Sequence, residues 1–228
     1  MKPSNRVLSG FLIVVAVVVV AIVVAARIIA GPLGSVDPDQ PLVERSLDEA
    51  FRSIDLEGPW RVEVQAGASH EAHVSGPESV LAALRFGVEE GVLTASLRSG
   101  FRVSGPLTLR ATVTDLASVR FAGAADARED GIETDALVVE VLGAAELRVD
   151  ESTIGELTLL SSGAAEIDFS GSLVSDAHLD MAGASELDIT MNGGVLSGRA
   201  RGAGDVTYGG QVSSVDVATR PAVDLRRR

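Results

Sequence analysis

The sequence predicts an all-β fold, a parallel β-helix with about 20 residues per turn, preceded by one transmembrane helix. Two features predict it: a Gly-Ala step that recurs through the second half of the chain and an apolar segment near the N-terminus. The step begins, with spacings of 20, 20, 20 and 19 residues, at Gly123, Gly143, Gly163, Gly183 and Gly202. Repeats of fixed length are typical of folds in which each repeat buries its apolar side against its neighbours.

Apolar and polar residues alternate inside each repeat, which indicates β-strands. Four and six residues after the glycine, the inward positions hold Leu147 and Val149, Ile167 and Phe169, Leu187 and Ile189, and Val206 and Tyr208. No repeat offers a helical stretch, so the pattern favours a β-helix over a leucine-rich repeat. We expect each of the five glycines to form a structural corner that requires a positive φ or leaves no room for a Cβ atom.

The repeated motif has the sequence GAAEL from Gly143 and GASEL from Gly183. Together with the segments FRSIDLEGPWRVEVQAG and SVLAALRFGVEEGVLTASL, it resembles the auto-transporter adhesin head GIN domain family over residues 51–217. The resemblance implies a right-handed parallel β-helix in a bacterial envelope protein, and it implies no catalytic residues. The fifth repeat, RGAGDVTYGG, comes one residue early and is richer in glycine, so we expect it to mark the C-terminal end of the stack.

Residues 7–31 are predicted to form a transmembrane signal-anchor helix. From Gly10 to Ala26 no side chain is polar, and residues 7–30 are almost wholly apolar. At 1.5 Å per residue the longer span is about 36 Å, enough to cross a hydrocarbon core of roughly 30 Å. A cleaved signal peptide is the alternative, with Lys2 and Arg6 before the apolar core and a cleavage site after residue 30.

Charge predicts the orientation of this span. Basic residues precede it and acidic residues follow it, so the positive-inside rule places the N-terminus in the cytoplasm and the rest of the chain outside. The predicted location is the bacterial cytoplasmic membrane, with a single span and an extracytoplasmic β-domain. The expected segments are a cytoplasmic N-terminus at 1–6, the anchor at 7–31, a Pro-rich spacer at 32–45, the GIN-like β-helix domain at 46–220 and a basic C-terminal tail at 221–228.

Composition excludes several kinds of chemistry. The 228 residues include 32 acidic and 19 basic side chains, and the formal net charge of −13 argues against nucleic acid as a partner. The chain has no cysteine, and its one lysine is Lys2, so thiol nucleophiles, cysteine zinc sites and Schiff-base lysines are absent. The string HEAH at His70 is one residue short of the HExxH zinc motif. We therefore expect neither a metal site nor a cofactor.

A column of acidic residues is the sharpest local signal for function. Its members stand three or five residues after the repeat glycines, on the outward side of the strands, at Asp126, Glu146, Glu166, Asp168, Glu186, Asp188 and Asp205. Adjacent strands lie about 4.8 Å apart, so neighbouring charges repel by roughly 0.9 kcal/mol in water before salt screening. Three interpretations stay open: a solvated edge that keeps the fold soluble, a ladder of divalent-cation sites, or a protein-binding stripe.

The sequence thus predicts a membrane-anchored, non-catalytic envelope module for binding, adhesion or envelope-stress sensing. Its expected partners are the membrane and an unidentified envelope protein or surface ligand. The alternative is a β-helical enzyme that acts on polysaccharide through carboxylates on adjacent turns, namely Glu166, Asp168, Glu186 and Asp188. That alternative is an analogy from fold class. The chain also offers few aromatic side chains as sugar platforms, which favours the binding module.

Overall fold

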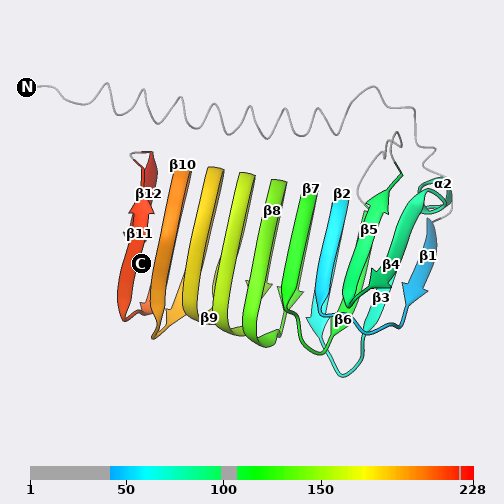
Figure 1. Cartoon of the computed structure of the whole chain (residues 1–228), viewed down its shortest axis with the longest axis horizontal. Coiled ribbons are helices and arrows are strands. Elements are labelled where there is room, and N and C mark those ends of the chain that lie inside the picture. Colours follow the sequence, from blue (N-terminus) through cyan, green and yellow to red (C-terminus); the bar gives the residue numbers. More distant parts are fainter. Residues whose placement is uncertain (1–41, 99–106, 221) are drawn as a thin grey trace, which may run out of the picture.

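The structure, a computed structural model, describes residues 42–98, 107–220 and 222–228. The strands form one 12-stranded mixed sheet in the order β1-β3-β6-β2-β7-β8-β9-β10-β11, with β12 beside β10, and with β5 beside both β2 and β4. Figure 1 shows the strands side by side along the long axis, from β1 at one end to β11 and β12 at the other. The elements are β1 Leu42–Leu47, β2 Ser53–Ala66, β3 Glu71–Pro77, α2 Glu78–Leu81, β4 Leu84–Glu89, β5 Val92–Leu97, β6 Leu107–Val113, β7 Ser118–Asp130, β8 Glu133–Asp150, β9 Thr153–Asn192, β10 Val195–Gln211, β11 Ser214–Thr219 and β12 Val223–Arg227.

Parallel pairing joins β2 and all strands from β7 onward. β7 pairs with β8, β8 with β9 and β9 with β10, while β11 and β12 both pair with β10. β2 lies on the other side of β7 and pairs with it in parallel. Glycines of successive strands lie opposite one another in the pairs Gly58 and Gly123, Gly123 and Gly143, Gly143 and Gly163, and Gly183 and Gly202. We call β7 to β11 the parallel ladder.

The N-terminal strands pair differently, and the predicted fold class is wrong for this reason. β1 with β3, β3 with β6 and β4 with β5 are antiparallel pairs, so the sheet is mixed and residues 46–220 do not form a uniform right-handed parallel β-helix. These strands lie in a region that lacks the 20-residue repeat, and a tight turn explains one of the three antiparallel pairs. Between β4 and β5, Glu90 (φ 50°) and Gly91 (φ 76°) both have positive φ, which is the geometry of a tight antiparallel hairpin.

The predicted fold class and location also included a membrane-spanning helix. In residues 42–98, 107–220 and 222–228, no helix is both long and apolar enough to cross a membrane. The predicted anchor at 7–31 lies outside the described residues, as does the predicted N-terminus at 1–6. The single-pass location in the cytoplasmic membrane is therefore corrected, because the described fold does not support it.

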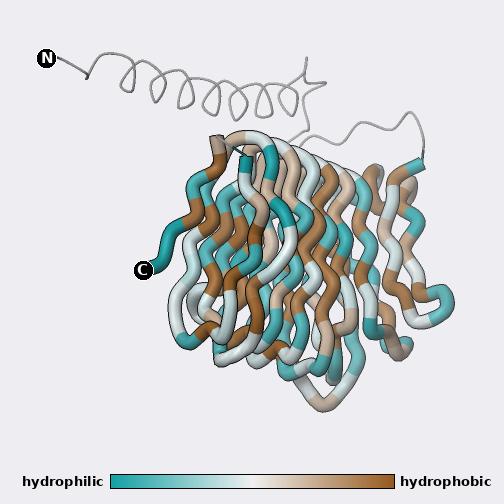
Figure 2. Tube along the Cα trace, turned by 60° about the vertical axis from the view of Figure 1, so that its left-hand side comes forward, coloured by the Kyte–Doolittle hydropathy of each residue, from teal (hydrophilic) through white to brown (hydrophobic). Residues whose placement is uncertain are grey.

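The core lies on the inner face of the sheet, where every second side chain of a strand points inward and is buried. On β9, Ile167 and Phe169 are 1% and 0% exposed, whereas Asp168 between them points outward. Figure 2 shows apolar and polar residues alternating along each turn and aligned between neighbouring turns. Because successive residues of a strand face opposite sides, the parallel register turns each inward position into an apolar column and each outward position into a polar one.

The backbone approaches itself closely where the glycines stack. Gly163 has a φ of +147°, and a Cβ atom there would lie under 3.0 Å from the carbonyl oxygen of Gly143, closer than real Cβ atoms come. Each of the other predicted corner positions would also place a Cβ under 3.0 Å from the carbonyl oxygen of the preceding glycine in the column: Gly123, Gly143, Gly183 and Gly202. Side chains are therefore excluded from this column by backbone atoms of the adjacent turn.

We predict that Phe169→Ala lowers the free energy of unfolding by about 3–5 kcal/mol, because it removes a fully buried ring from the core. The control is Leu173→Ala, since Leu173 is 45% exposed and its truncation should change stability by about 0.5 kcal/mol or less. Urea unfolding of both variants measures the difference. Equal losses in the two variants would contradict the alternation of buried and exposed columns.

Candidate functional site

The structure brings the predicted acidic residues together on one outward face. Asp126 lies opposite Glu146, and Glu146 lies opposite Glu166, on β7, β8 and β9. Glu186 follows on the second half of β9 and interacts electrostatically with both Glu166 and Asp205. We call Asp126, Glu146, Glu166, Glu186 and Asp205 the acidic column.

Arginines neutralise both ends of the acidic column. On β2, the Arg61 Nε atom is 3.4 Å from an Asp126 carboxylate oxygen. On β12, the Arg226 guanidinium is 2.7 Å from Asp205 and 3.0 Å from Asp224. Across the described part of the chain, the three central glutamates form no ion pair within 4.0 Å: Glu146, Glu166 and Glu186.

Burial and repulsion from neighbouring carboxylates both act on the pKa of Glu186. Burial raises the pKa of its carboxyl group, and the neighbouring Glu166, Asp205 and Asp188 raise it further. Arg226 acts in the opposite direction. The centre of the column is therefore a region of uncompensated negative charge.

The two carboxylates that stand five residues after a glycine of the column, Asp168 and Asp188, have basic partners instead. Asp168 is 3.4 Å from Arg148 and accepts a 2.8 Å hydrogen bond from the Ser170 amide. Burial alone would raise the pKa of Asp168, but Ser170 and Arg148 lower it below its usual value. Asp188 is 2.9 Å from Arg228. These two carboxylates are thus already engaged with arginines, whereas Glu166 and Glu186 are not.

Charges on the opposite side of the glycine column are paired as well. Arg120 bridges Asp55 at 2.8 Å and Glu140 at 3.1 Å. Asp180 contacts Arg199 at 2.5 Å and Arg201 at 3.3 Å, and the hydrogen bond from Arg199 is the main reason that its pKa falls to about 2. Compared with these networks, the centre of the acidic column stands out as unpaired.

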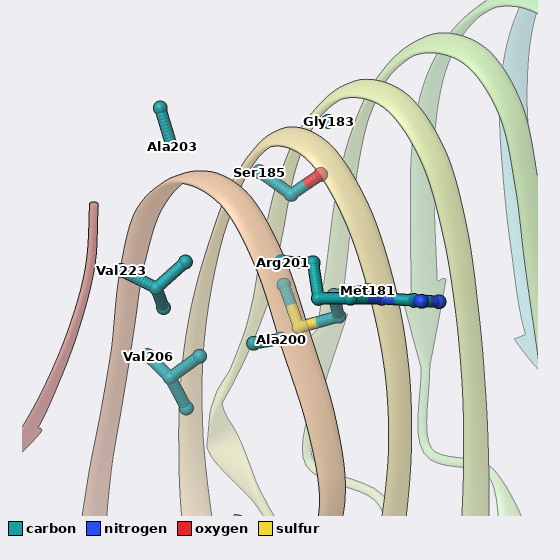
Figure 3. A pocket seen from close by; sticks show the side chains of 8 residues that line it. All are labelled: Met181, Gly183, Ser185, Ala200, Arg201, Ala203, Val206 and Val223. Carbon is teal, nitrogen blue, oxygen red and sulfur yellow. The ribbon is translucent and has the colours of Figure 1, made fainter. Parts of the chain in front are cut away.

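Two hollows lie away from the acidic column. A small cavity of about 10 Å³, room for roughly one water, lies near the C-terminal end of the ladder. Figure 3 shows the side chains that line it. An open depression of about 620 Å³ lies near the N-terminal strands, with Arg52, His70, Thr114 and Asp115 in its wall. There Arg52 pairs with Asp115, and Thr114 Oγ1 is 2.9 Å from His70 Nε2. Neither hollow is lined by a member of the acidic column.

The described residues also bear on metal binding. Within these ranges, no group of three or more His, Asp or Glu side chains is placed to hold a metal ion. His73 instead lies 3.1 Å from Glu44 and 3.8 Å from Glu71. The divalent-cation interpretation of the acidic column therefore gains no support from side-chain geometry.

Sequence reasoning missed three residues that the structure makes important. Gly58 is the first glycine of the column. It lies much more than 20 residues before Gly123 in the sequence, so a 20-residue period does not identify it. Arg61 on β2, which pairs with Asp126 of the acidic column, was missed for the same reason. Glu129 occupies the inward position six residues after Gly123, where later repeats have Val149 or Phe169, so a column-by-column reading had a signal to find it.

The fold and the charged outer columns define a repetitive β-protein whose candidate functional surface is a sheet face. Residues 50–210 match the model of the family described as "Putative auto-transporter adhesin, head GIN domain". The match covers more than half of the chain, so the chain belongs to this family, and the resemblance noted from its repeated motif is confirmed. The family description names an adhesin and no enzyme, which supports a non-enzymatic, adhesin-like role.

Solved structures resemble this chain at low sequence identity. A "putative adhesin" from Bacteroides fragilis is 15% identical, with a TM-score of 0.66 over 84% of this chain and 99% of that chain. A "putative lipid binding protein" from Parabacteroides distasonis is 12% identical, with a TM-score of 0.42 over 82% of this chain and 97% of that chain. No curated protein matches the chain significantly. At such identities, the Bacteroides structure shows a shared fold.

We predict that Arg226→Gln raises the pKa of Glu186, because it removes the positive charge that favours the ionised carboxylate. The matched control is Arg227→Gln, since Arg227 donates a hydrogen bond to the Gly210 carbonyl oxygen and forms no ion pair among the described residues. Carbon-detected NMR titration of the Glu186 carboxyl group measures both. An unchanged or lowered pKa in Arg226→Gln would contradict the described end of the column.

Proposed function

We propose that this protein is a non-catalytic binding module and that the centre of its acidic column binds a positively charged surface of a ligand. The ligand would be a macromolecular surface with repeated positive groups, such as a basic patch on an envelope or surface protein. Adhesion and envelope-stress sensing both require such a binding step, and the proposal concerns that step. The family assignment supports a non-enzymatic role but does not identify the ligand.

The observation that carries the proposal is the contrast between charge columns. Three other outward carboxylates of the ladder, Asp168, Asp180 and Asp188, have arginine partners within 4.0 Å. Glu146, Glu166 and Glu186 have none among the described residues, although they stand in one line on successive turns. Placing like charges about 4.8 Å apart costs stability, and a cationic ligand would relieve that repulsion.

The spacing also indicates how such a ligand would bind. A single exposed ion pair contributes about 0–1 kcal/mol, so one contact gives no useful affinity. Several contacts on a rigid ladder add up, because the strands already hold the backbone at each carboxylate in place and only side-chain entropy is lost on binding. Binding of this kind should weaken steeply with salt, since the Debye length is only about 10 Å at 0.1 M.

We predict that the full-length chain, kept in a nonionic detergent, binds immobilised poly-L-lysine, and that the triple change Glu146→Gln, Glu166→Gln and Glu186→Gln weakens binding at least tenfold. The control has the same net charge but leaves the column intact, through changes at three exposed glutamates: Glu133→Gln, Glu151→Gln and Glu156→Gln. Biolayer interferometry at 50 and 200 mM salt measures both triples. Equal losses would show that net charge alone drives binding and would overturn the proposal.

A further inference from the structure

Glu129 lies inside the apolar core at the end of β7. It is 0% exposed, and it is the one charged residue among the fully buried residues of the described ranges. The parallel register places it between Val64 of β2 and Val149 of β8. The corresponding inward positions of later turns hold Phe169 and Ile189, so an apolar side chain fits this column.

The Glu129 carboxyl group has no partner. Neither of its oxygens has a hydrogen-bond partner among the described residues. Burial is the sole cause acting on its ionisation, and it raises the pKa of Glu129 to about 8. An ionised carboxylate without a partner is expensive to bury, so the group stays protonated at neutral pH.

Charged groups on the elements packed against Glu129 do not face it. β2 turns Val64 inward, and its neighbours Glu63 and Gln65 lie on the outer side of the sheet. β8 turns Val149 inward, and its flanking charged residues Arg148 and Asp150 are likewise partly exposed on the outer side. The low-dielectric surroundings of Glu129 therefore contain no charge that would stabilise its ionised form.

The position of Glu129 in the fold gives this buried acid a structural consequence. The β2–β7 pairing joins the N-terminal strands, with their antiparallel pairs, to the parallel ladder. Glu129 lies on β7, between Val64 of β2 and Val149 of β8, so its side chain is part of the core packing at this junction. A charge formed there can reach water only if the strands packed around this end of β7 separate.

We propose that Glu129 makes the junction between β2 and β7 a pH-dependent weak point, closed while the carboxyl group is protonated and loosened when it ionises. The ladder from β8 onward would keep its pairing, because its described inward positions hold no charged residue. Lowering the pH would then tighten the connection between the N-terminal strands and the ladder, and raising it would release them.

The sign of the effect follows from linkage. The folded-state pKa of about 8 lies above the ordinary glutamate value of 4.5, so the folded protein binds more protons than the unfolded chain between these pH values. The stability contributed by Glu129 is fully present below pH 4.5, falls as the pH rises, and is lost above pH 8. Inside this window the unfolding equilibrium constant rises about tenfold per pH unit from this group alone.

The test compares thermal unfolding of the full-length protein, in a nonionic detergent, with that of Glu129→Gln and Glu129→Val. Between pH 5.5 and 7.5 we expect the wild-type Tm to fall by roughly 5–10 °C more than the Tm of either variant. Two variants are used because the glutamine leaves a polar group buried, whereas valine is the residue that both adjacent strands carry. Glu133→Gln, which removes an exposed carboxylate from the same turn, should behave as the wild type.

Hydrogen exchange locates the effect. In the wild type, amides of β7 should lose protection between pH 6 and pH 8, after correction for intrinsic rates, while amides of β9 keep theirs. In Glu129→Val both strands should stay protected. Parallel Tm profiles in wild type and Glu129→Gln would overturn the proposal, and so would equal loss of protection in β7 and β9.

Discussion

The close stacking of backbone at the glycine column is the constraint on which the rest of this fold depends. Each glycine bends the sheet at a positive φ and lies against the carbonyl oxygen of the glycine in the preceding turn, where a Cβ atom would overlap it. This contact fixes the register of neighbouring turns, because a shift by one residue would place Ala124 or Ala144 in the gap that only glycine fits. A shift by one residue would also turn every inward side chain outward.

Register in turn explains both the core and the charged face. Once Gly143 lies opposite Gly163, Leu147 must lie over Ile167 and Glu146 over Glu166. The same constraint that builds an apolar column therefore builds a line of like charges on the outside. The protein neutralises the ends of that line with Arg61 of β2 and Arg226 of β12, which flank the line on its two sides, and leaves its centre without arginine partners.

Sequence reasoning succeeded where structure is local and periodic, and it failed where contacts are distant. The repeats from Gly123 to Gly202 show their strands and inward columns in the spacing alone. The N-terminal strands have no period, and their antiparallel pairs join residues such as Leu42 and Pro77, which no local pattern connects. The arginines at the C-terminus look like a solvated tail in sequence, yet β12 pairs with β10 and places Arg226 and Arg228 on carboxylates 20 or more residues away.

Three alanine substitutions test the role of the glycine column most directly, with the free energy of unfolding measured in urea. Gly163→Ala meets both a positive φ and the backbone of Gly143, Gly58→Ala meets a positive φ of 115° but only side-chain atoms near 4 Å, and Gly87→Ala meets open space. We expect losses of about 3–5 kcal/mol at Gly163, about 1–2 kcal/mol at Gly58 and about 0.5 kcal/mol or less at Gly87. Equal losses at Gly163 and Gly58 would contradict the account, because positive φ alone would then explain the column and close backbone stacking would not.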